Sequence, residues 1–325
     1  MTYRKHHRYL TMVGLVILML ALPLLGTACR APDAPASAPA QRLAATMVPN
    51  RDLDIFILIK QASPTKVPLS LVGAQADVTV ESLALWGVAR DDDKFTIAGA
   101  LTFASASDAS RIHSQIPAEA EVWTKLSDRN IYFVQGDGGP GQSLKSLISN
   151  NNMKRYDDKR ALEEVALMPD GGSTRFAAIG VVRPNRALIN ILKQHSDSAT
   201  AERIDTIFTW AKPEVVTFGL YAPQQIDIID ILQRLPSNTI WDADFGLTVS
   251  VKSTFPGLVF GPVASKALES AGYTRATLGN LTVFKGSFNI GRTIPVLLNV
   301  DGNRVFITVS GKESYAEALM SGIRR

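Results

Sequence analysis

The chain has 325 residues, 46% of them hydrophobic, and 34 Lys and Arg residues stand against 30 Asp and Glu residues. Residues 1–28 hold three of these cations and no acid, so 31 cations against 30 acids leave the remainder at a net charge of +1. Nucleic-acid binding depends on neutralising phosphates, and a nearly neutral chain without an extended Lys/Arg cluster is therefore not expected to bind nucleic acid.

The N-terminus has the pattern of an export signal. Three basic residues precede an uncharged apolar run over residues 10–25, and the small residues 26–28 lead to Cys29, the only cysteine of the chain. This order of charged, apolar and small residues is typical of a cleavable signal peptide. The alternative is an uncleaved transmembrane helix, since about eighteen uncharged apolar residues are enough to span a bilayer. Both alternatives place the rest of the chain outside the cytoplasm.

Thr27, Ala28 and Cys29 resemble the lipobox of bacterial lipoproteins, in which a small residue precedes an invariant cysteine. The resemblance implies that residues 1–28 are removed and that Cys29 is acylated as the first mature residue. The membrane is then a partner, and the protein is extracytoplasmic and anchored to the bacterial cell membrane. Residues 29–45 are rich in Ala and Pro, which predicts an extended linker between anchor and domain.

Strand-like and helix-like segments alternate along the body of the chain. Residues 46–156 are expected to form an N-terminal α+β unit, with strands at 82–90, 94–103, 121–126 and 130–134 and helices at 108–116 and from 143.

A helical middle segment is expected over residues 157–213. It contains helices at 157–167, 185–195 and 199–211, with a strand at 175–182.

Residues 214–325 are expected to form a C-terminal α+β unit. Asp301-Gly302 lies between two apolar runs and predicts a hairpin. The predicted strands are 215–221, 244–251, 277–284, 294–300 and 304–309, and the predicted helices are 225–235, 262–271 and 314–321.

Hairpins with interspersed helices favour the α+β class, with antiparallel sheets covered by helices on one face. The order of elements predicts two divergent strand-strand-helix-strand-strand-helix units around the helical middle segment.

Gly136, Gly138 and Gly141 form a G-x-G-x-x-G pattern between a predicted strand and a predicted helix. Free N–H groups at a helix start favour an anion, so the three glycines are a weak candidate for an anion-binding loop. A dinucleotide site would need a second strand ending in an acid about 20 residues later. Glu163 and Glu164 lie at that distance but within a predicted helix, so a surface loop is favoured and no cofactor is expected.

Metal and catalytic motifs are scarce. After residue 28 the histidines are His113 and His195, which form no metal-ligand spacing, so no metal site is expected. No serine stands at a G-x-S-x-G elbow, so no catalytic residue is assigned. We therefore expect a membrane-anchored, non-catalytic domain that binds a protein or a small molecule of unknown identity. A tethered hydrolase with carboxylates gathered by the fold and a structural or assembly protein of the envelope are the alternatives.

Overall fold

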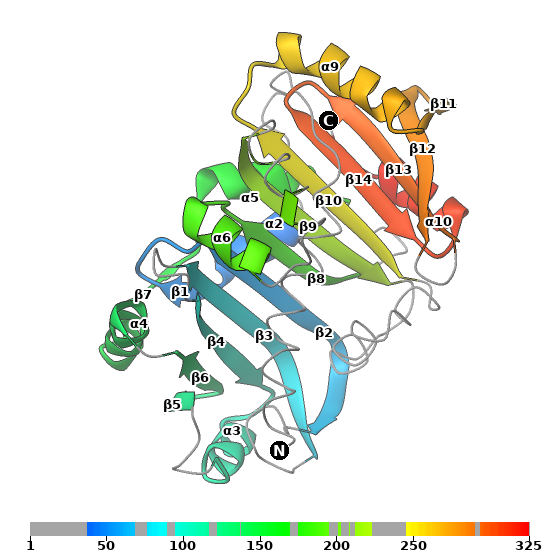
Figure 1. Cartoon of the computed structure of the whole chain (residues 1–325). Coiled ribbons are helices and arrows are strands. Elements are labelled where there is room, and N and C mark those ends of the chain that lie inside the picture. The colour runs from blue at the N-terminus through cyan, green and yellow to red at the C-terminus, as the bar shows by residue number, and fades with distance from the viewer. Residues whose placement is uncertain are drawn as a thin grey trace.

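The computed structural model describes residues 38–324 except for residues 69–76, 90–94, 117–121, 137, 170–174, 195–200, 203–207, 209–211, 223–244 and 290–292. These described residues contain seven helices and one open antiparallel sheet of 12 strands (Figure 1). The α+β class with an antiparallel sheet, predicted from the sequence, is confirmed.

The N-terminal half of the sheet has the strand order β2-β3-β4-β6-β5. Helix α3 (Ala106–His113) follows β4, and helix α4 (Gly139–Ser149) follows β6. The strands are β2 (Ile55–Pro68), β3 (Asp77–Ala89), β4 (Phe95–Phe103), β5 (Val122–Ser127) and β6 (Asn130–Gln135).

The C-terminal half continues the sheet in the order β8-β9-β10-β14-β13-β12-β11. Helix α9 (Gly257–Ser270) follows β10, and helix α10 (Glu313–Ser321) follows β14. The strands are β8 (Arg175–Val182), β9 (Pro213–Ala222), β10 (Gly246–Ser253), β11 (Thr274–Leu278), β12 (Leu281–Asn289), β13 (Thr293–Asp301) and β14 (Arg304–Ser310).

The two halves share a pattern of pairing. In each half a helix follows the third strand, and the last strand of a later hairpin, β5–β6 or β13–β14, pairs with that third strand. The C-terminal half adds the hairpin β11–β12 at its edge. The halves meet where β2 pairs antiparallel with β8 and Ile57 lies opposite Gly180, so one sheet runs through the whole domain (Figure 1).

Three further helices and a small ribbon complete the fold. Helix α2 packs against α5 and β8. The elements are α2 (Ala38–Ala45), α5 (Lys159–Ala166), α6 (Arg186–Gln194) and the two-stranded sheet of β1 (Met47–Pro49) with β7 (Met153–Arg155).

Helices cover both faces of the sheet, whereas the sequence pattern predicted them on one face. Phe56 and Leu58 belong to a core with residues of α2, α4 and α5, while Ile57 and Ile59 belong to a core with residues of α3, α6 and α9. Side chains alternate between the faces of a strand, so an uninterrupted apolar run makes both faces apolar. Each face then needs its own cover.

Three local predictions are corrected. Residues 38–45 form helix α2 instead of an extended linker, because Ala40 and Leu43 are buried against the domain. The strand predicted at 277–284 is the hairpin β11–β12, in which Leu278 pairs with Leu281 and Gly279 turns the chain at a φ of 60°. The central strand β2 was not predicted, because its continuous apolar run lacks the alternation of a half-buried strand.

Candidate functional site

Helix α9 presents an apolar face to solvent. Leu258 is 90% exposed, Val259 is 68% exposed and Val263 is 46% exposed. Their spacing places them on one side of the helix, together with the exposed Pro262. Apart from Met47, they are the exposed large hydrophobic residues of the part of the chain that the structure describes. Exposed apolar side chains gathered in one place mark a contact surface more often than scattered ones do.

The opposite side of α9 holds the helix on the sheet. Phe260, Ala264 and Leu268 are buried in the core on the α3, α6 and α9 face of the sheet. The ring of Phe255, just before the helix, stacks on Phe260 at 6.2 Å between centroids. Lys212 lies over the ring of Phe255, with its Nζ 5.4 Å from the ring centroid. The exposed face is therefore the outer side of a helix that is already fixed to the domain.

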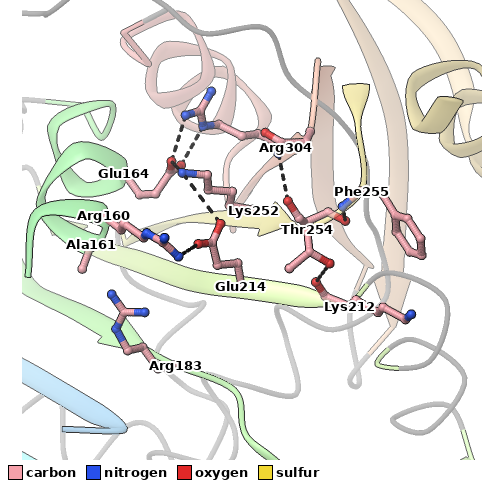
Figure 2. Close-up of polar contacts among 12 residues, drawn as sticks. Arg160, Ala161, Glu164, Arg183, Lys212, Glu214, Lys252, Thr254, Phe255 and Arg304 are labelled. Carbon is pink, nitrogen blue, oxygen red and sulfur yellow. Dashed lines mark hydrogen bonds and ion pairs between the residues drawn. The ribbon is translucent and has the colours of Figure 1, made fainter. Parts of the chain in front are cut away.

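A buried carboxylate lies on the other face of the sheet, beneath α5. Glu164 is 1% exposed and accepts two hydrogen bonds from Arg304, at 2.7 Å from Nε and 2.9 Å from Nη2. The Nζ of Lys252 lies 3.2 Å from the same carboxylate (Figure 2). Burial lowers the pKa of Arg304, but the bonds and charge of Glu164 outweigh it, and the pKa is raised. This cluster connects α5 with β10 and β14.

The network continues to β9 through Glu214. This carboxylate pairs with Arg160 of α5 and lies 3.9 Å from Lys252 (Figure 2). Glu164 and Glu214 thus converge on one lysine, and each also has its own arginine. A hydrolase would need one carboxyl group that is free to take or give a proton. Ion-paired carboxylates in this arrangement fix helix α5 to the sheet and give no support to the hydrolase alternative.

Asp158 forms a second structural ion pair. It accepts the N–H of Ala161 at 3.1 Å as the N-cap of α5, and both of its oxygens bind the guanidinium of Arg183. Burial raises the pKa of Asp158, but the bonds from Arg183 and Ala161 are together stronger, and the pKa is lowered. The arrangement holds the start of α5 next to the end of β8.

Asp54 is a partly buried carboxylate with neutral partners. Its Oδ2 accepts the N–H of Ala89 at 2.8 Å, and its Oδ1 accepts Nδ2 of Asn185 at 2.6 Å. Asn185 in turn accepts the N–H of Leu188 and caps α6. Burial raises the pKa of Asp54 above its ordinary value despite these bonds. A raised pKa alone does not make a site, and the contacts of Asp54 join β2, β3 and α6.

Buried hydroxyl groups lie on the neighbouring strands β9, β10 and β14. Thr308 donates to the carbonyl of Ala316 at 3.1 Å, and Ser310 donates to the carbonyl of Phe245 at 2.7 Å. The hydroxyl groups of Thr217, Thr248 and Ser250 are buried, and among the residues that the structure describes they have no hydrogen-bond partner.

Of the three glycines of the predicted anion loop, Gly136 and Gly138 lie between β6 and α4, and Gly141 lies in the first turn of α4. Gly136 and Gly138 adopt φ values of 114° and 103°, which favour glycine. Gly141 lies within α4 so close to Gly136 that a Cβ there would stand 2.3 Å from the Gly136 carbonyl oxygen. This close turn accounts for the glycines by backbone geometry, and anion binding stays a prediction.

The other residues singled out from the sequence are not gathered into a site. His113 of α3 lies 3.4 Å from Thr124, whereas Cys29, His195 and the predicted helix at 225–235 lie outside the described residues. Among the residues described, no group of three or more His, Cys, Asp or Glu side chains is placed to hold a metal ion. Over the same residues, no helix has the length and apolarity needed to cross a membrane.

Comparison with known proteins gives a distant structural likeness. No protein-family model and no curated protein matches the chain. Crystal forms I and III of the Treponema protein TP0453 have TM-scores of 0.35 and 0.32 and are each 10% identical. The matches cover 88% and 90% of this chain and 98% and 100% of the solved chains. Scores this low carry no argument about function.

Sequence reasoning missed the apolar face of α9 because it began this helix at residue 262. The first turn therefore fell outside the predicted helix, and Leu258 and Val259 were never placed on a face. Pro256 before an apolar run is the signal that would have moved the start, since proline is tolerated at a helix N-terminus. The partners of Glu164 are 88 and 140 residues away and no local pattern points to them.

Proposed function

We propose that the protein is an extracytoplasmic lipoprotein, held on the bacterial cell membrane by Cys29, whose domain is a binding module and not an enzyme. The observation that carries the binding role is the apolar outer face of α9, formed by Leu258, Val259 and Val263. Exposing such side chains to water is unfavourable, and covering them with a partner recovers that free energy.

The anchor is supported by the sequence around Cys29. A basic start, an apolar run and small residues before a single cysteine together match what an exported lipoprotein needs. The nearly neutral charge of the mature chain fits a domain that is not attracted to nucleic acid. The ion-paired state of Glu164 and Glu214 fits a structural use of these carboxylates.

The test of the anchor is the Cys29→Ser substitution in the full chain. We expect the natural protein to fractionate with membranes and to show a diacylglyceryl group on Cys29 by mass spectrometry of the mature N-terminus. The variant should lose the acyl group and keep residues 1–28, because the processing enzyme no longer recognises the cleavage site. If the variant is still shortened and membrane-bound, the proposed anchor is wrong.

A second candidate function, assembly with other envelope proteins, is favoured by the open sheet. Among the strands that the structure describes, β5 and β11 each have a paired neighbour on one side only. Unpaired strand edges can pair with a further strand from another chain. Light scattering of the purified mature chain tests this candidate, and a monomer at micromolar concentration would count against self-assembly.

A further inference from the structure

We propose that the apolar face of α9 is a second membrane contact, and that Leu258, Val259 and Val263 enter the surface of the same anionic bilayer that holds the acyl group. The inference rests on the tethered binding domain proposed above and names its occupant as a lipid surface. Three observations favour lipid over a protein partner: the size of the face, the charges around it and the length of the tether.

The size of the face fits a lipid contact better than a protein interface. A specific protein–protein interface buries at least about 1,000 Å². Three exposed apolar side chains at one end of one helix cover far less than this. A helix that rests on a bilayer needs only to insert a short apolar face to the level of the acyl boundary.

The charges around the face have the order expected at a bilayer surface. The exposed face carries no charge over residues 258–263, and Lys266 then follows on the same side. At 1.5 Å per residue, Lys266 lies about 10 Å along the helix from Val259. A lysine at the end of an apolar face is placed to meet an anionic headgroup while the face enters the apolar layer.

The tether keeps this face within reach of the membrane. Eight residues lie between Cys29 and the start of α2 at Ala38, and this stretch of nine Cα–Cα steps spans at most about 32 Å when fully extended. Helix α2 packs on the opposite face of the sheet from α9, so the tether confines the domain near the lipid surface but reaches it from the far side of the sheet.

The test holds the domain at a bilayer without using the acyl group. In the mature chain, an N-terminal hexahistidine replaces Cys29 and binds vesicles of phosphatidylethanolamine and phosphatidylglycerol that contain a nickel-chelating lipid. Val259→Cys then provides a unique thiol for a polarity-sensitive nitrobenzoxadiazole dye. The matched control is Met47→Cys, because Met47 is also a large exposed apolar residue, 44% exposed, but lies on β1. The readouts are the emission shift and quenching by lipids with a nitroxide on the acyl chain.

We expect a blue shift and strong quenching for the dye at residue 259 and neither at residue 47. Without the chelating lipid, Leu258→Asp combined with Val259→Asp should weaken vesicle binding by about tenfold or more, whereas Met47→Asp should not. Circular dichroism and thermal unfolding verify that each variant is folded. An unshifted, unquenched dye at residue 259 would overturn the inference. So would a change of oligomeric state in the aspartate variant with vesicle binding unaltered, which would assign the face to a protein. Neither result depends on acylation of Cys29, so failure of the anchor is recognised separately.

Discussion

The surroundings of Glu164 fit a structural role and not a catalytic one. Its buried carboxylate accepts two hydrogen bonds from Arg304 and lies next to Lys252, so these two cations compensate its negative charge. Removing one member of a buried ion pair leaves the others without compensation, and this is far more destabilising than losing a pair at the surface. The role of Glu164 is therefore measurable as stability.

We expect Glu164→Gln to lower the free energy of unfolding by about 3–5 kcal/mol, because Arg304 and Lys252 keep their charges in a buried place. Urea denaturation measures the change. The matched control is Glu313→Gln, which removes an exposed partner of Lys285 and should leave the unfolding midpoint close to that of the natural chain. Equal effects of the two substitutions would contradict the buried role of Glu164.

The unpaired hydroxyl of Thr248 predicts a substitution that stabilises the protein. A buried hydroxyl without a partner costs about 1–3 kcal/mol, so Thr248→Val should raise the free energy of unfolding by about 1 kcal/mol or more. Thr308 lies directly opposite Thr248 and donates to Ala316, so Thr308→Val should be destabilising. Chemical denaturation of both variants measures whether the free energy of unfolding rises in the first and falls in the second. A loss of stability in Thr248→Val would show that its hydroxyl does have a partner.

Asp158 predicts part of the acid sensitivity of the fold. Its pKa is lower in the folded protein than its ordinary value of 3.8, so its charged form stabilises the folded state. That contribution is complete above the unfolded-state pKa and is lost as the pH falls through the folded-state pKa. Asp158→Asn keeps an N-cap residue but removes the charge. Melting temperatures measured from pH 7 to pH 2 should fall less steeply in this variant, and an unchanged slope would refute the assignment.

At the scale of elements, the β6–α4 turn shows how a sequence motif is explained by backbone geometry. Gly136, Gly138 and Gly141 match a phosphate-loop pattern, but two of them adopt positive φ and the third allows close approach of the chain. The pattern therefore has a structural explanation whether or not an anion binds there.

We expect Gly141→Ala to destabilise the protein by about 2 kcal/mol or more, because the added Cβ meets the Gly136 carbonyl. Gly139→Ala is the matched control in the same helix, where a Cβ would meet nothing within 4 Å. It should leave stability unchanged or raise it by up to about 1 kcal/mol. Thermal unfolding compares the two variants, and similar melting temperatures would contradict the close turn.

At the scale of the whole molecule, the β2–β8 ladder joins the two repeated halves into one sheet. One core contains residues from both halves, including Ile57 and Leu101 from one and Val249 and Ile307 from the other. A shared sheet and a shared core give neither half an independent interior. The repeat in chain order therefore does not divide the molecule into two folding units.

This continuity predicts a single unfolding transition. Phe218 is buried with its ring against Gly180. Phe218→Ala should therefore lower the free energy of unfolding by about 3–5 kcal/mol. The melting temperature should fall, but the protein should still unfold in a single transition. Scanning calorimetry measures this as the agreement between the calorimetric and van't Hoff enthalpies. Two separated transitions would show that the halves unfold independently.

The sequence alone determined the α+β class and most strands and helices, and it predicts the tether at Cys29, which stays a prediction. These depend on local signals such as periodicity, turn residues and the N-terminal pattern, which are read over a few neighbouring positions. The tertiary structure decided what lies far apart in the chain: that Glu164 meets Arg304, that β2 joins β8, and that α2 is packed instead of extended. It also decided that Phe260 is covered while Leu258 is not. Apolar residues look alike in a sequence, and only the packed neighbours determine which of them remain in water.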